Sequence, residues 1–432
     1  LNCLTELVEE TGGFIELDNL PIGDPTLSNK EIIGNESQER MGLIIKRENI
    51  HEFIQICERE RAPVYIVGKV TDDGRFTIYS EKTNLKCVDL DLGHFFGSSP
   101  QTILKDKSVS KKYNQIKYST KLVHRYVEQL FSLESVGCKD WLTNKVDRCV
   151  GGKVAKQQCV GELQLPLNNC GVMALDFSTT HGVATSIGHS SISALIDPES
   201  GSKNSIAEAL TNIIWAPIEN NLKGVSLSAN WMWPCRNYGE DARLYKAVDS
   251  LSKFAIELGI NIPTGKDSLS MNQKYEDIEV KSPGTVIISA TAHCSDIYNI
   301  IEPPLKANKG SVFYINLSSD DYKLGGSAFS QIIGNIGVDT PTINDSKYFL
   351  NVFDTIQKMI KKKLIISGHD VGSGGLITTL MEMCFSTNNI GAKIDLTSLN
   401  EKDSVKLLFS ENSGIVIPVS YTHLTLPTKN EV

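Results

Sequence analysis

The sequence lacks the features that mark several protein classes. No apolar run approaches the roughly 20 residues that a helix needs to cross a bilayer, and no charged-then-apolar signal segment opens the chain. The ten cysteines include no Cys-x-x-Cys pair, which argues against zinc-finger and thioredoxin-like chemistry. We therefore expect a cytoplasmic protein with reduced thiols and no membrane partner.

The chain also has no excess of positive charge. It carries 43 lysines and arginines against 51 aspartates and glutamates, a net charge of −8. Because nucleic-acid binding depends on clustered Lys and Arg, we expect no nucleic-acid partner. What is present, 41% hydrophobic and 22% charged residues over 432 positions, is typical of a globular protein with two or three domains.

The most informative stretch is Ser205–Asn212. Its apolar residues recur at helical spacing, and Glu208 and Asn212, four positions apart, stand on one face of the predicted helix. A carboxylate and an amide oxygen so arranged suit Mg²⁺, which prefers oxygen ligands. The alternative is an ordinary amphipathic helix with a surface Glu and a surface Asn.

Around this stretch, predicted helices and strands alternate. Pro198 and Gly201 are expected to break the preceding segment, so that Ser202 or Asn204 caps the helix. Other helices are predicted at Asn49–Glu60, Leu122–Leu133, Tyr245–Leu258, Ser327–Ile336, Lys347–Ile360 and Leu376–Phe385. Strands are predicted at Met41–Ile45, Pro63–Val70, Phe76–Tyr79, Cys170–Leu175, Val225–Asn230, Gly284–His293, Val312–Leu317, Leu364–Ile366 and Gly414–Val419. Gly182–Ile187 is a segment of small and apolar residues.

Two glycine-containing segments are candidates for phosphate binding. Gly265–Met271 combines a glycine, a lysine, an acid and two hydroxyls but lacks the Walker pattern, so taken alone it predicts a polar turn rather than a phosphate site. Gly368–Gly375 opens a predicted helix, where backbone N–H groups and the positive helix end form an anion site. Asp370 would repel a bare phosphate there but would hold a metal that a phosphate shares. For His369 we expect a buried, hydrogen-bonded side chain rather than a ligand.

A weak internal repeat, which we call the internal echo, occurs near the two ends of the chain. Asn35–Ser37 precedes the predicted strand Met41–Ile45, and Ser410–Ser413 precedes the predicted strand at Gly414. An acid, a small polar residue and then a strand occur in both places. This pattern indicates a duplicated α/β unit.

Six motifs, in this order, resemble those of the phosphoribosylformylglycinamidine synthase family in its large single-chain form. They are Asn35–Arg40, Glu58–Pro63, Glu208–Asn212, Ser228–Met232, Gly265–Met271 and His369–Gly375. The resemblance covers residues 1–419. It implies an α/β (α+β) fold of aminoimidazole-ribonucleotide-synthetase-like A and B domains, with mixed sheets and packed helices.

The resemblance also implies a domain order. Residues 1–95 would be the C-terminal part of a first B domain, 96–118 a linker, 119–298 a second A domain with an auxiliary nucleotide site, and 299–419 a second B domain. Residues 420–432 resemble translated cloning sequence and are expected to be a non-native tail. The N-terminal, first A and glutaminase domains would be missing, so we expect the chain to be inactive alone.

The family reaction implied is that of an ATP-dependent carbon–nitrogen ligase with glutamine as amido donor. It converts formylglycinamide ribonucleotide to formylglycinamidine ribonucleotide in de novo purine biosynthesis. The implied partners are this ribonucleotide, ATP and ammonia from the glutaminase domain, and the implied cofactors are Mg²⁺ and ATP or ADP. The alternative is a nucleotide-binding structural module of the same fold without turnover. A selenophosphate-synthetase-like or hydrogenase-maturation-like relative is a third interpretation, disfavoured by the motif order.

The resemblance assigns functional roles to individual positions of this sequence. It implies no catalytic residue within the chain. The matching positions are Glu36, Ser37 and Gln38 for substrate; Lys139, Asn168, Gly372, Lys266 and Ser268 for nucleotide; and Asn169, Glu208, Asn212 and Asp370 for metal. Three positions depart from the family. Asn169 replaces an expected Asp, Gly372 stands where a nucleotide-contacting Ser is usual, and Ser373 stands where an Asp is usual. Losing a carboxylate is expected to weaken the auxiliary site.

Overall fold

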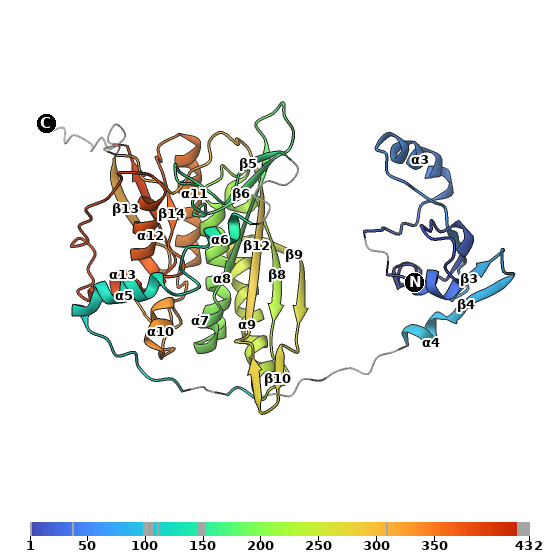
Figure 1. Cartoon of the computed structure of the whole chain (residues 1–432), viewed down its shortest axis with the longest axis horizontal. Coiled ribbons are helices and arrows are strands. Elements are labelled where there is room, and N and C mark those ends of the chain that lie inside the picture. The colour runs from blue at the N-terminus through green and yellow to red at the C-terminus, as the bar shows by residue number, and fades with distance from the viewer. Residues whose placement is uncertain are drawn as a thin grey trace. The chain divides into compact units, whose positions relative to one another are not determined.

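The computed structural model describes residues 2–36, 39–97, 103, 107–109, 112–145, 152–307 and 310–420. The chain divides into two compact units, residues 1–103 and 104–432 (Figure 1). Among the described helices, none has both the length and the apolar character that crossing a bilayer requires.

The first unit is built on a four-stranded sheet in the order β2-β1-β3-β4. Strand β1 lies parallel to β3, and the other pairs are antiparallel. The strands are β1 Gly13–Glu16, β2 Gly68–Val70, β3 Arg75–Ser80 and β4 Leu85–Asp91; the helices are α1 Asn2–Leu7, α2 Asn29–Gly34, α3 Ile50–Arg59 and α4 Leu92–Phe96, with short 3-10 turns at Leu17–Asn19 and Arg47–Asn49. Its small core contains Ile15, Leu17, Phe76, Ile78 and Leu92.

Two strands predicted for this unit are wrong in whole or in part. Residues 41–45 form no strand, and of Pro63–Val70 only Gly68–Val70 pairs. Met41 is 88% exposed and Leu43 is 55% exposed. An apolar run predicts strand propensity, but a strand also needs a neighbour, and none of the described strands of this unit lies beside residues 41–45. The predicted helix Asn49–Glu60 and strand Phe76–Tyr79 are confirmed as α3 and β3.

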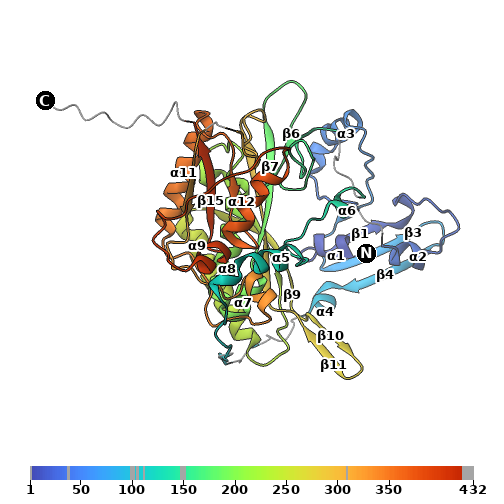
Figure 2. The ribbon, with the colours of Figure 1, turned by 60° about the vertical axis from the view of Figure 1, so that its left-hand side comes forward.

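The second unit contains a mixed six-stranded sheet in the order β5-β6-β7-β12-β8-β9. All neighbours are antiparallel except β8 and β9, which are parallel. The strands are β5 Val154–Lys156, β6 Gly171–Ala174, β7 Gly182–His189, β8 Val225–Met232, β9 Asn261–Ser268 and β12 Thr285–Cys294. A separate hairpin, β10 Asn272–Tyr275 and β11 Ile278–Lys281, projects from this sheet (Figure 2).

Helices α8 (Pro198–Ile213) and α9 (Glu240–Leu258) cover one face of this sheet (Figure 1). Residues of β7 and β12 alternate between buried and more exposed, as expected for strands with one covered face. Fully buried side chains such as Ile206, Leu210 and Ile288 form the core between helix and sheet. At Gly188, a Cβ would lie 2.3 Å from the backbone of α8, so only glycine permits this approach.

The predicted start of α8 is wrong. The helix begins at Pro198, and the Asp197 carboxylate caps it by accepting from two backbone N–H groups. Proline is well tolerated in the first helical turn, where its missing N–H costs nothing. Gly201 lies inside the helix, where a Cβ would stand 2.7 Å from Ala194 of α7 (Ser191–Ile196). Proline and glycine therefore serve the helix start and the α7–α8 contact here.

The predicted polar turn Gly265–Met271 is also different. Residues up to Ser268 belong to β9, the edge strand that pairs with β8. Because β9 is largely exposed, its sequence shows no apolar alternation. A Cβ on Gly265 would lie 2.3 Å from the Ala229 carbonyl oxygen, so the glycine allows the two strands to approach.

A three-stranded antiparallel sheet, β13-β15-β14, completes the second unit. All six residues of the central strand β15 are buried. The strands are β13 Ser311–Asn316, β14 His369–Asp370 and β15 Gly414–Val419; the helices are α5 Val123–Phe131, α6 Asp140–Thr143, α10 Ala328–Ile333, α11 Ser346–Lys361, α12 Gly375–Phe385 and α13 Ser404–Phe409, with 3-10 turns at Thr120–Leu122 and Asn221–Gly224. The predicted strand Leu364–Ile366 is reduced to one isolated bridge between Ile365 and Val419.

Candidate functional site

A cavity of about 160 Å³ lies between α8 and the turn that precedes α12, and we call it the α8–α12 cavity. Six stretches of the chain contribute to it: Ser135 after α5, the end of β7 with the start of α7, α8, the start of α10, the Gly-rich turn and the residues before β15. Its lining residues are Ser135, His189, Ser190, Ser191, Ile192, Asn204, Glu208, Gly326, Ala328, Gln331, Val371, Gly372, Ser373, Glu411 and Ser413. No lysine or arginine occurs among these described lining residues.

Two carboxylates converge on Gly372 in this cavity. A Cβ at Gly372 would lie 3.5 Å from Oδ2 of Asp370 and 3.6 Å from Oε1 of Glu208. Asp370 ends β14, which pairs with the buried central strand β15, and Glu208 projects from the rigid helix α8. The absence of a side chain at Gly372 therefore leaves a space that two carboxylate oxygens flank.

The surroundings of Glu208 disfavour its charge. Burial raises the pKa of its carboxyl to about 8, and the nearby Asp370 and Glu411 carboxylates act in the same direction. The His189 backbone N–H opposes this by donating to Oε2 at 2.6 Å. A divalent cation between the carboxylates would reverse the balance, because positive charge stabilises the ionised form.

The neighbouring Asn212 is also tied to β7. Its Nδ2 donates to the Ile187 carbonyl oxygen at 3.4 Å, two residues before the His189 N–H that Glu208 accepts. The two α8 side chains, one helical turn apart, thus contact the same strand. This arrangement fixes their common face toward β7, as the spacing of four residues predicts.

His369 is buried and hydrogen-bonded, and this expectation is confirmed. Its ring is 8% exposed, Nδ1 lies 2.5 Å from Asn169 Oδ1, and Nε2 lies 2.9 Å from Glu382 Oε2. Burial disfavours the imidazolium, but Asp370 and Glu382 outweigh it and raise the pKa of His369 to about 9. Near neutral pH the ring is therefore a cation beside Asp370, whose Oδ1 lies 3.3 Å from Nδ1.

Asn169 joins this group from the loop before β6. Its Oδ1 contacts His369, and its Nδ2 donates to the Gly368 carbonyl oxygen at 3.1 Å. Asn169 and Asp370 therefore approach the same imidazole nitrogen. Asn169 and Asp370 are linked through His369, and Asp370 and Glu208 both face Gly372. Of the four predicted metal ligands, only Glu208 is among the described residues that line the cavity.

Sequence reasoning missed Glu411 as a site residue. Its Oε1 accepts hydrogen bonds from the Gly374 backbone N–H at 2.7 Å and from the Ala328 backbone N–H at 2.8 Å. One carboxylate oxygen thus joins the start of α12 to the start of α10. The only sequence signal was the echo between residues 35–37 and 410–413, which gave Glu411 no role.

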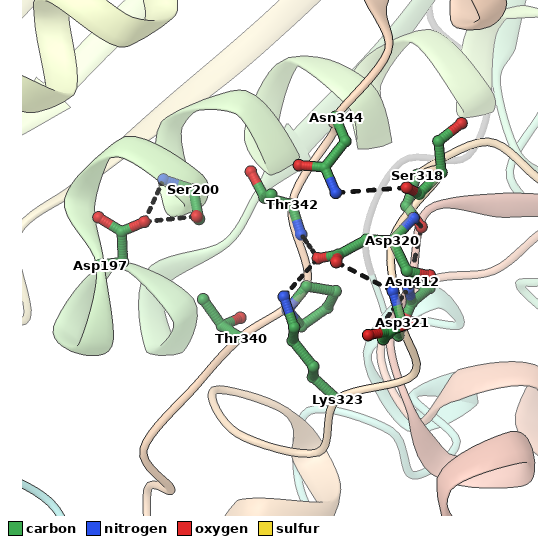
Figure 3. A network of polar contacts seen from close by, with 12 residues as sticks. Asp197, Ser200, Ser318, Asp320, Asp321, Lys323, Thr340, Thr342, Asn344 and Asn412 are labelled. Carbon is green, nitrogen blue, oxygen red and sulfur yellow. Dashed lines mark hydrogen bonds and ion pairs between the residues drawn. The ribbon is translucent and has the colours of Figure 1, made fainter.

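A polar network behind the cavity holds Glu411 and Ser413 in place (Figure 3). Asn412, between them, is fully buried and donates through Nδ2 to Ser318 Oγ at 2.9 Å. The same amide lies 3.3 Å and 3.1 Å from the carbonyl oxygens of Asp320 and Asp321. The cavity wall is therefore anchored to the loop that follows β13.

The remaining predicted nucleotide residues do not line the described cavity. Lys139 precedes α6 and donates to the Gly137 carbonyl oxygen at 2.9 Å, close in sequence to the lining residue Ser135. Asn168 donates to the Gln157 carbonyl oxygen at 2.7 Å. The role of both residues as nucleotide contacts stays a prediction.

Lys266 and Ser268 lie on β9, at the opposite edge of the sheet from β5. Lys266 Nζ donates to Ser268 Oγ at 2.7 Å. Of the predicted substrate residues, Glu36 is exposed after α2 in the first unit. Ser37 and Gln38 lie outside the described residues. The proposed roles of all five positions remain predictions.

The oxygen atoms that face Gly372 are of the type that Mg²⁺ prefers as ligands. Carboxylate oxygens from Glu208 and Asp370 face the space at Gly372, and hard cations prefer such oxygens. Within the described parts of the chain, no group of three or more His, Cys, Asp and Glu side chains is arranged as a metal site. A cation here would accordingly need amide, water or phosphate oxygens, which is how Mg²⁺ commonly binds.

Comparison with protein families identifies both parts of the chain. Residues 138–293 match the family described as the FGAR-AT PurM_N-like domain. Residues 1–81 and residues 310–420 both match the C-terminal domain of AIR synthase related proteins. The expected α/β fold of synthetase-like A and B domains is confirmed, and the duplicated match agrees with the internal echo.

Curated relatives match nearly the whole chain. The phosphoribosylformylglycinamidine synthases of Dictyostelium discoideum and Homo sapiens are 38% and 35% identical, each over 97% of this chain and 32% of their own length. That of Drosophila melanogaster is 36% identical over 98% of this chain and 34% of its own. The chain thus spans about a third of the length of these relatives.

Solved structures agree on the fold. Thermotoga maritima PurL complexed with FGAR is 13% identical, with a TM-score of 0.56, covering 96% of this chain and 56% of that one. PurLQS from the same organism is 15% identical, with a TM-score of 0.55 and 97% and 59% coverage. The sequence relatives, at 35–38% identity over nearly the whole chain, show that the chain is homologous to about a third of a phosphoribosylformylglycinamidine synthase.

Proposed function

We propose that the α8–α12 cavity binds an adenine nucleotide together with Mg²⁺, as an auxiliary site of an ATP-dependent ligase. The ligase would convert formylglycinamide ribonucleotide to formylglycinamidine ribonucleotide with ammonia from glutamine. The observation that carries the proposal is the convergence of Glu208 and Asp370 on Gly372, beside the Gly-rich turn.

Different residues would bind the cation and the nucleotide. Glu208 and Asp370 would hold the cation, with Asn169 and Asn212 as neutral oxygen donors. Bound Mg²⁺ would neutralise charge on the nucleotide phosphates. The protonated His369 is held by Glu382 through Nε2 and contacts Asn169 and Asp370 through Nδ1, so it would orient both side chains. Lys139, Asn168 and Gly372 would contact the nucleotide in this cavity. Lys266 or Ser268 would lie near phosphate in a separate cleft that faces the catalytic half of a complete enzyme.

Related solved structures support an adenine nucleotide as the ligand. Thermotoga maritima PurL has been solved with ATP, with ADP and with AMPPCP. One structure of that protein contains FGAR. Because these proteins are 15% or less identical to this chain, they support the class of ligand and say nothing of individual residues here.

The chain itself would act as a nucleotide-binding module without turnover. It spans about a third of its curated relatives, and the family reaction needs a catalytic nucleotide site and a source of ammonia. Glu36, Ser37 and Gln38 would contribute to the substrate side of the catalytic site in a complete enzyme. We further propose the domain limits 1–95, 119–298 and 299–419, and a cytoplasmic location.

The test is to denature the purified chain and measure released adenine nucleotide and magnesium. About one nucleotide per chain supports the proposal. If none is released, calorimetric titration of the chain with ADP in excess Mg²⁺ decides it. The absence of binding in both experiments would refute an auxiliary nucleotide site.

Two variants separate this site from unspecific binding. D370N removes a carboxylate at Gly372, and we expect a loss of Mg²⁺–ADP affinity of about tenfold or more. The matched control is D354N, because Asp354 accepts the Leu222 backbone N–H at 3.3 Å, away from the cavity. Equal affinities of the two variants would contradict the assignment. An assay with ribonucleotide, ATP and glutamine is expected to give no product.

A further inference from the structure

One backbone amide of the Gly-rich turn and one at the start of α10 are engaged by the same carboxylate of the protein. A glycine-rich turn before a helix ordinarily offers backbone N–H groups to a phosphate. Here the Gly374 N–H donates to Glu411 Oε1 at 2.7 Å. The Ala328 N–H donates to the same oxygen at 2.8 Å. Glu411 therefore occupies these two donors with an internal carboxylate.

The backbone on each side of Glu411 restrains this arrangement. The Asn412 side chain is bonded to the loop at residues 318–321, as Figure 3 shows. Directly after it, β15 pairs with β13 on one side and β14 on the other. The turn is equally specific, because a Cβ at Gly374 would lie 2.2 Å from Thr378 Oγ1. The position of Glu411 is thus restrained by its neighbours in the chain, and the turn that it contacts is restrained by the close approach of Gly374 to Thr378.

The charges around the cavity add to this effect. Glu208 and Glu411 both line it, and the described lining residues include no lysine or arginine. Burial raises the pKa of Glu411 to about 7, although its two backbone hydrogen bonds act in the opposite direction. An anion that entered without a cation would meet carboxyl groups, and the amides of Gly374 and Ala328 are already bonded.

We propose that Glu411 sets the ligand requirement of the α8–α12 cavity. By holding the Gly374 and Ala328 amides, it withholds them from the phosphates of a nucleotide, so that a nucleotide binds there only together with its divalent cation. Glu411 acts through the turn and is a positioning residue. The inference rests on the proposed function, because it concerns the same cavity and the same class of ligand.

The test compares ADP binding to the full chain in excess Mg²⁺ and in EDTA. The ratio of the two dissociation constants measures the dependence on the cation. For the wild type we expect binding at least about tenfold tighter with Mg²⁺. E411A removes the charge and opens both amides, so we expect this ratio to fall by about tenfold, mainly through tighter binding in EDTA.

E411Q separates the two effects of Glu411. Its amide oxygen still accepts from both backbone N–H groups while the charge is gone, so its ratio is expected to lie between those of the wild type and E411A. The matched control is E162A. Glu162 also accepts a backbone N–H, that of Asn388 at 3.1 Å, but does not line the described cavity. Its ratio is expected to equal that of the wild type.

The outcomes distinguish this inference from the proposed function. If the variants bind Mg²⁺–ADP with the wild-type ratio, the inference is overturned and the nucleotide site stands. If the wild type binds no ADP in either condition, both are overturned. Circular dichroism establishes which variants fold. Should E411A not fold, an unchanged ratio in E411Q overturns the inference, and a reduced ratio supports it.

Discussion

At the scale of single residues, the least expected feature of the site is Asn169. Its two side-chain atoms serve different neighbours, His369 through Oδ1 and the Gly368 carbonyl oxygen through Nδ2. A carboxylate at this position would keep the first contact and lose the second, because it has no N–H to donate. The residue therefore exchanges one negative charge for one hydrogen bond.

N169D is expected to bind Mg²⁺–ADP about tenfold more tightly, because a third carboxylate then stands near Asp370. The same variant without ligand is expected to lose about 1 kcal/mol of unfolding free energy with the Gly368 contact. Calorimetric titration and urea unfolding in EDTA measure the two effects. A variant that binds no tighter would show that the missing carboxylate does not limit affinity.

Glu411 gives a prediction about pH. Its pKa rises from 4.5 in the unfolded chain to about 7 in the native protein, chiefly through burial. Between these values the unfolded chain releases the proton and the native protein keeps it, so the stability of the wild type falls as pH rises. E411Q has no such titration. We expect its stability relative to the wild type to increase by about 1–3 kcal/mol from pH 4.5 to pH 7, and then to level off.

Urea unfolding of both proteins in EDTA, at several pH values between 4.5 and 8, measures this difference. Subtracting one protein from the other removes the titration of groups that both share. The difference in unfolding free energy between E411Q and the wild type should therefore grow with pH. If it stays constant or decreases, the environment of Glu411 does not disfavour its ionised form.

Sequence reasoning reached Glu208 and Asp370 and missed Glu411 for a physical reason. Glu208 belongs to a helical spacing, and Asp370 belongs to a Gly-rich turn, so local patterns contain both. Glu411 acts through Gly374 and Ala328, which are 37 and 83 residues away. Only the folded chain brings that carboxylate to those amides, and no local pattern encodes it.

At the scale of elements, the site depends on how closely α8 lies against β7. Glu208 accepts the His189 N–H of β7, and the neighbouring Gly188 has no room for a Cβ beside Ser205 and Ala209. G188A would force the helix away from the strand. We expect it to lower the unfolding free energy by about 3 kcal/mol and to weaken Mg²⁺–ADP binding.

The matched control is G171A, on the same sheet. A Cβ at Gly171 would meet only Thr185 Oγ1 at 3.6 Å and the Lys156 carbonyl oxygen at 3.9 Å, which are ordinary contacts. Thermal unfolding and calorimetric titration of both variants test the comparison. If G188A is as stable as G171A and binds as tightly, the close packing of α8 on β7 is not what positions Glu208.

Elements whose apolar pattern matched their burial could be predicted, and others could not. The buried strands β12 and β15 appear close to their predicted limits, and the long amphipathic helix α9 ends at the predicted Leu258 but begins at Glu240, before the predicted Tyr245. The exposed strand β9 shows no pattern, because neither of its faces is buried. Residues 41–45 have the pattern without a described neighbouring strand. The spacing of apolar residues indicates which face of an element is buried, whereas a strand also needs a neighbouring strand with which to pair.

At the scale of the whole molecule, the chain consists of two units divided at residue 103, and this point falls within the predicted linker 96–118. The domain limits themselves remain a prediction. Every residue that lines the α8–α12 cavity, from Ser135 to Ser413, belongs to the second unit. The first unit has its own sheet and its own core.

Deletion of residues 1–103 is therefore expected to leave Mg²⁺–ADP affinity within about twofold of the full chain, because every described residue that lines the cavity belongs to the second unit. Calorimetric titration of both proteins measures this, and circular dichroism checks that the second unit keeps its fold. A decrease of about tenfold or more in a folded protein would mean that the first unit contributes to the nucleotide site. In that case Glu36 would be the first residue to substitute, because it is the described member of the predicted substrate group.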